Sequence, residues 1–165
     1  MMGMIASFFR VTPKALQGLK SNPDEAADLI FEMEEIEELE LDIDKSWHGI
    51  YFLLSGVADI DQPTGGHIGR AVLGGHELGE DYGYGPLRYF EPSEVAEIYN
   101  ELKEISPDEL ASRFDRETLS EHGIYPMNKK WTEEDKDYLV DNYDFLLRYY
   151  ETAVKNNEGM LLLIQ

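Results

Sequence analysis

The fold is decided by residues 41–56, which read LDIDKSWHGIYFLLSG. At the start of this stretch apolar residues alternate with acids, and the alternation predicts a brief strand or an extended link over residues 39–43. The apolar side chains that follow recur at helical spacing, at Trp47, Ile50, Tyr51 and Leu54. We therefore expect a helix that Ser46 or Asp44 caps and that Gly56 ends in the left-handed conformation.

Apolar runs at both ends of the chain predict buried strands over Gly3–Val11 and Met160–Ile164. A last strand placed beside the first would tie both termini into one sheet. Between them, helix-start signals recur at Thr12-Pro13, Asn22-Pro23, Glu91-Pro92, Ser106-Pro107 and Thr132. Strands and helices mix along the chain, which indicates the α/β or α+β class.

The composition excludes several classes of function. A chain of 165 residues is typical of one domain, and its net charge of −20 makes it a poor ligand for nucleic acid or an anionic membrane. The absence of cysteine excludes disulfides, thiolate nucleophiles and zinc fingers. No signal peptide or membrane span is evident in the sequence, so we expect a cytoplasmic protein.

Acids are concentrated between Ser21 and Asp44, which contain eleven Asp and Glu and no Lys or Arg. One interpretation is a solvated helix face that keeps the protein soluble. The other is a docking surface for a basic protein partner, because a negative face speeds association with a positive one. Its candidate residues are Glu34, Glu37 and Glu38.

A glycine-rich stretch, residues 65–85, holds 8 of the 14 glycines. We expect a short strand at Ile68 and Ala71–Leu73 and a loop over the remainder. Together with the start of the 47–54 helix, this stretch would form a pocket from Trp47, His48, His67, Arg70, His76, Tyr84 and Arg88. His48 or His76 would act as acid or base, and the arginines would hold an anionic small molecule.

The same residues also have structural interpretations. His48 would anchor the helix start by a hydrogen bond, and the two arginines would neutralise nearby acids. There is no P-loop, dinucleotide fingerprint or catalytic-serine elbow. No metal-ligand spacing occurs either, so we predict no metal site and no cofactor.

Three ordered blocks resemble the DUF1877 (YfbM-like) family, which has no known function. They are Leu41–Gly56, Ala71–His76, and Gly83–Pro86 with Pro92–Val95. The resemblance covers nearly the whole chain. It implies a single α/β domain over residues 1–165, built as a three-layer sandwich with helices packed on a central mixed sheet. It implies no activity and carries no catalytic residue over.

Three functions remain open at this point. The first is an interaction module, immunity-like or antitoxin-like, that binds a basic protein. The second is a small-molecule-binding or enzymatic domain that uses the pocket described above. The third is a domain of a larger assembly without chemistry of its own.

Overall fold

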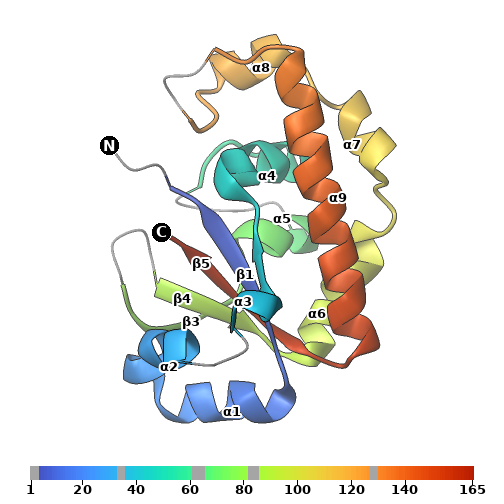
Figure 1. The fold of residues 1–165 in the computed structure, drawn as a ribbon. Coiled ribbons are helices and arrows are strands. Elements are labelled where there is room, and N and C mark those ends of the chain that lie inside the picture. The colour runs from blue at the N-terminus through green and yellow to red at the C-terminus, as the bar shows by residue number, and fades with distance from the viewer. Residues whose placement is uncertain (1–3, 33–35, 61–65, 82–85, 127–129) are drawn as a thin grey trace.

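A five-stranded sheet forms the centre of the molecule, with the strand order β2-β1-β5-β4-β3 (Figure 1). The structure is a computed structural model that describes residues 4–32, 36–60, 66–81, 86–126 and 130–165. The strands are β1 (Ala6–Val11), β2 (Glu40–Asp42), β3 (His76–Asp81), β4 (Pro86–Phe90) and β5 (Gly159–Ile164). The predicted pairing of the terminal strands is confirmed, because β1 lies beside β5 from Ala6 opposite Ile164 to Val11 opposite Gly159.

The α/β class is confirmed, but the sheet is antiparallel rather than mixed. Each neighbouring pair of strands in it is antiparallel. The long helix α9 (Glu134–Lys155) explains the direction of β5. Its 22 residues span about 33 Å and deliver the chain to the end of the sheet where β1 finishes. The strand that starts there must run back against β1.

Helices cover both faces of the sheet, which confirms the predicted three layers (Figure 1). One face carries α1 (Pro13–Ser21), η1 (Pro23–Glu25) and α2 (Ala26–Glu32), and the short α3 (Ile36–Leu39) precedes β2 in the chain. The other carries η2 (Asp44–Ser46), α4 (Trp47–Ser55), α5 (Gly66–Leu73), α6 (Pro92–Leu102), α7 (Pro107–Ser112), α8 (Arg116–Glu121) and α9. The strand side chains divide accordingly: Phe8 and Leu162 belong to the larger core, and Phe9 and Leu161 to the smaller one.

The prediction for residues 65–85 is wrong. The expected strand at Ile68 and Ala71–Leu73 is helix α5, and the expected loop contains β3. Ile68, Ala71 and Val72 stand at i, i+3 and i+4, which is helical spacing. Glycine has low helix propensity, and the glycines around these apolar positions concealed the helix.

Several predicted helix ends are confirmed. Thr12 accepts a hydrogen bond from the Ala15 N–H (3.1 Å) and Ser106 accepts one from the Glu109 N–H (3.1 Å). Gly56 ends α4 with φ +75°. The start of α4 differs in detail, because Ser46 lies in η2 and its hydroxyl donates to the Ile43 carbonyl instead of capping the helix. Local signals thus position α4, which carries Trp47 and His48.

We predict that the close approach of α4 and α9 makes Gly49 intolerant of a side chain. A Cβ at Gly49 would lie 2.8 Å from Leu139 Cδ2, and Leu139 is fully buried. Gly49→Ala should lower the free energy of unfolding by about 1–3 kcal/mol, measured by urea denaturation.

Gly18→Ala is the matched control, because Gly18 is exposed inside α1 and a Cβ there meets nothing within 4 Å. It should raise the free energy of unfolding by up to about 1 kcal/mol. Equal stability of the two variants would contradict this packing of α4 against α9.

Candidate functional site

The predicted pocket residues fall into two separate clusters. Trp47 and His48 begin α4, whereas Arg70, His76 and Arg88 lie on α5, β3 and β4. The side chain of His67, and Tyr84 altogether, lie outside the described residues. Of the predicted partner face, Glu38 is exposed on α3, and Glu34 and the side chain of Glu37 lie outside the described residues.

The first cluster is a buried stack of aromatic rings. The Trp47 ring lies 5.5 Å from the rings of both His48 and Tyr125. Its indole N–H donates to the Met4 carbonyl (3.0 Å), and the Met4 N–H donates to the Tyr125 hydroxyl (2.6 Å). These bonds join the start of α4 to the N-terminal end of the sheet and to the segment after α8.

Both ring nitrogens of His48 are used inside this cluster. The Tyr125 N–H donates to Nδ1 (2.7 Å), so Nε2 carries the ring proton and donates to the Ala58 carbonyl (2.7 Å). Burial lowers the pKa of His48 below its usual range, and the bond to Ala58 only partly offsets this. This geometry supports the structural interpretation of His48 and leaves neither nitrogen for acid–base catalysis.

The second cluster is centred on Glu94 in the first turn of α6. Its Oε2 lies 3.0 Å from Arg70 Nη2 and 2.8 Å from His76 Nε2, and its Oε1 accepts the Glu91 N–H (3.0 Å). Burial alone would raise the pKa of Glu94, but these three partners outweigh it and lower the pKa. One carboxylate therefore joins α5, β3 and α6.

The arginines of this cluster have partners within the chain. Arg70 pairs with Glu94 and lies over the Phe90 ring at 5.3 Å. Arg88 donates to the Leu73 carbonyl at the end of α5 (3.3 Å), where its positive charge interacts favourably with the negative end of the helix dipole. Arg70 thus pairs with an acid, as the structural interpretation expects, whereas Arg88 bonds to a backbone carbonyl rather than to an acid.

Among the predicted residues whose side chains the structure describes, His76 is the one in a chemically useful setting. Its side chain is 55% exposed, and its Nε2 is held by the mostly buried carboxylate of Glu94. A histidine held in this way presents Nδ1 as a proton acceptor, which is how a carboxylate orients a general base. Sequence reasoning missed Glu94, although the Glu91-Pro92-Ser93-Glu94 signal had marked it as the third residue of a helix.

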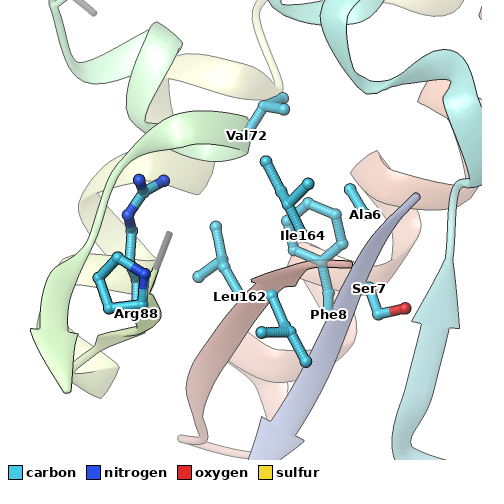
Figure 2. Close-up of a pocket in the computed structure, with 9 residues that line it drawn as sticks. Ala6, Ser7, Phe8, Val72, Arg88, Leu162 and Ile164 are labelled. Atoms are coloured by element: carbon cyan, nitrogen blue, oxygen red, sulfur yellow. The ribbon is translucent and has the colours of Figure 1, made fainter. Parts of the chain in front are cut away.

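A small cavity lies beside this cluster, where β4 and β5 separate (Figure 2). The paired register of these strands ends at Arg88 and Leu162, although β4 continues to Pro86 and β5 to Ile164. The cavity measures about 10 Å³, which is room for one water molecule. Ser7 also lines it, but its hydroxyl points away from Arg88 and Leu162 (Figure 2).

A wider surface hollow of about 380 Å³ lies beside η2 and is lined by Lys45, Pro126, Trp131, Asp135 and Tyr138. At its rim Asp44 adopts φ +54°, which is unusual for a residue with a side chain. Tyr138 donates to Asp44 Oδ2 (2.6 Å), and the Asp44 N–H donates to Asp42 Oδ1 (2.6 Å). Burial and the Asp44 carboxylate raise the pKa of Tyr138, so its hydroxyl stays protonated and locks this turn.

Among the residues that the structure describes, which run from 4 to 165 with the gaps given above, no group of three or more His, Asp or Glu side chains could hold a metal ion. No helix among these residues is long and apolar enough to cross a membrane.

We predict that His48 makes stability depend on pH. The pKa of His48 is lowered in the folded state, so below about pH 6.5 the unfolded chain binds a proton that the folded chain excludes. The contribution of neutral His48 to the free energy of unfolding is therefore present above that pH and is lost as the pH falls. His48→Gln should cost about 1–3 kcal/mol at pH 7.5 and should lose less of its remaining stability than wild type between pH 7.5 and 5.5.

Urea denaturation at the two pH values measures both effects. His122→Gln is the control, because His122 is exposed at the end of α8. A wild-type pH dependence that His48→Gln leaves intact would contradict the assignment.

Comparison with known proteins places the chain in a family. Residues 2–163 match the family model DUF1877, a domain of unknown function. Protein YfbM of Escherichia coli (strain K12) is 37% identical over 86 residues, which are 52% of this chain and 51% of that protein, so the match spans about half of this relative. The fold is similar to the crystal structure of YfbM, a protein of unknown function from Escherichia coli, with a TM-score of 0.75 and 26% identity over 98% of this chain and 99% of the other. The chain therefore belongs to the DUF1877 family.

Proposed function

We propose that this protein is an interaction module that binds a basic protein partner, in the manner of an immunity protein or antitoxin. The surface that supports this proposal surrounds the outer edge of β2 and includes η2 and the neighbouring part of α9. We call it the acidic surface, and it consists of the exposed side chains of Glu38, Glu40, Asp42, Asp44, Asp137 and Asp141. It continues the acid-rich stretch that begins at Ser21 and has no Lys or Arg.

The observation that carries the proposal is how the charges are distributed. The chain has 34 acids and 14 Lys and Arg. The basic side chains that form ion pairs with acids of the same chain are Arg10, Lys20, Arg70, Arg113, Lys136, Arg148 and Lys155. These cations are occupied by acids of the same chain, and part of the net charge of −20 that the excess of acids gives is exposed on the acidic surface.

Such a surface favours a basic protein over other partners. It repels phosphate groups, so nucleic acid and anionic lipid are disfavoured. It attracts a positive protein surface over a distance of about 8–10 Å at physiological salt and so speeds association. Charge complementarity of this kind also rejects neutral and acidic competitors.

A second candidate function rests on His76 and Glu94. The orientation of His76 by a mostly buried carboxylate suits the transfer of a proton to its Nδ1 from a small anionic molecule that approaches the exposed face of the ring. This candidate would use Arg70 to hold Glu94 in place rather than to bind the ligand.

We predict that a variant with Glu38, Glu40 and Asp141 changed to Lys loses its partner. The control changes Glu97, Glu104 and Glu121 to Lys, three exposed acids on or beside α6 and α8 that give the same change in net charge. Each tagged protein is purified gently from its native host and examined by native mass spectrometry. Wild type and control should carry a stoichiometric basic protein that is released by added salt, and the acidic-surface variant should carry none.

Two outcomes would contradict the proposal. One is equal capture of the partner by the acidic-surface variant and the control. The other is a wild-type protein that carries a small molecule and no protein, which would favour the His76–Glu94 candidate.

A further inference from the structure

We infer that the partner contributes an extended basic segment that adds to the sheet as a strand along the outer edge of β2, beside Phe145. This inference rests on the proposed function and names the place and the form of the contact. The observations that carry it are the backbone of β2, the position of Phe145 and the charges on either side.

The outer edge of β2 offers backbone groups for pairing. β2 stands at one end of the sheet and pairs only with β1 among the described strands. In β1 the Ile5 backbone bonds to Gln165 beyond β5, whereas the Ala6 carbonyl accepts from Ile43 beyond β2. Backbone groups of successive residues point to opposite sides of a strand, so Phe8 bonds to its partner Leu41. The groups that point away from β1 are therefore those of Asp42 and the Glu40 carbonyl.

Phe145 stands beside this edge. It is 55% exposed, and no other large apolar side chain is this accessible in the described part of the chain. Tyr138 and Tyr149, seven residues before and four after it, share its side of α9. Tyr138 bonds to Asp44 after β2, and Tyr149 bonds to the Leu39 carbonyl before β2. Phe145 lies between these two tyrosines along α9, and it is therefore level with β2.

The charges on the edge select what can be added. Glu40 and Asp42 are exposed on the face of the sheet opposite α9, since Leu41 between them packs in the core that α9 covers. Acids on an edge strand repel a second copy of the same edge and so prevent self-association. The same acids attract a strand that carries Lys or Arg at matching positions.

The alternation of side chains along a strand defines the occupant further. Every second residue of the added strand would lie beside Glu40 and Asp42, and we expect Lys or Arg at these positions. The residues between them would lie on the α9 side, and we expect them to be apolar or β-branched and to contact Phe145. The expected segment therefore alternates basic and β-branched residues.

The probe is a capped synthetic peptide, Lys-Thr-Lys-Val-Lys-Thr-Lys, tested against the full chain by isothermal titration and backbone NMR. A second peptide of the same sequence carries N-methyl groups on alternate backbone nitrogens, which keeps the charge but blocks strand pairing. We expect the first peptide to bind and to protect the Asp42 amide from hydrogen exchange. We expect the methylated peptide to bind at least about tenfold more weakly, because hydrogen bonds along the edge are lost.

The protein variants separate the aromatic contact from charge. Phe145→Ser should weaken binding of the first peptide by about tenfold. Thr152→Ser is the matched control, because Thr152 is exposed on α9 seven residues further along and should leave the affinity unchanged.

Three results would overturn the inference. Equal binding of the two peptides would mean that charge alone holds them, which leaves the proposal of a basic partner standing. Equal affinity of the first peptide for wild type and Phe145→Ser would show that the peptide does not bind beside Phe145. Absence of peptide binding, with the native partner still captured by wild type, would show that the partner does not bind as an extended basic strand.

Discussion

The two hydrogen bonds of His48 are the constraint on which the larger layer of the structure depends. One ring joins the start of α4 to Ala58 after that helix and to Tyr125 after α8, and the neighbouring Trp47 adds Met4 before the first strand. The start of α4 is thereby fixed to the segment that follows it and to two segments that are distant in sequence. A neutral imidazole suits this task, because it presents one donor and one acceptor and carries no charge into the core.

Much of the fold could be predicted because its signals are local. The caps at Thr12 and Ser106, the end of α4 at Gly56, and the two terminal strands follow from a few adjacent residues each. The direction of the strands could not be predicted, since an unbroken apolar run indicates burial on both faces and not the neighbour's orientation. The helix over Gly66–Leu73 was missed because glycines outweighed its helical spacing.

The candidate site was predictable in its residue types but not in their grouping. His76, Arg70 and Arg88 do lie close to one another, yet the residue that unites the first two is Glu94, from a different part of the chain. With 34 acids in the sequence, no local signal distinguishes the carboxylate that will meet a histidine and an arginine. His48 was equally ambiguous, because its role depends on Ala58 and on Tyr125, which is 77 residues away.

The paired cations and the exposed acids lie in different surroundings. Arg10 and Arg70 form ion pairs at partly buried positions, where a charge must be compensated. The acids at the β2 edge are exposed to solvent, so their charge needs no compensating partner. Charge of either sign would be enough to keep a strand edge from pairing with a second copy of itself. Negative charge on both sides of Leu41, with an exposed aromatic ring on the neighbouring helix, does more than this protective role requires. Acids on β2 that prevent self-association also allow a second strand to bind there only if that strand is basic. The charge of one short strand and the net charge of the whole chain therefore favour the same kind of partner.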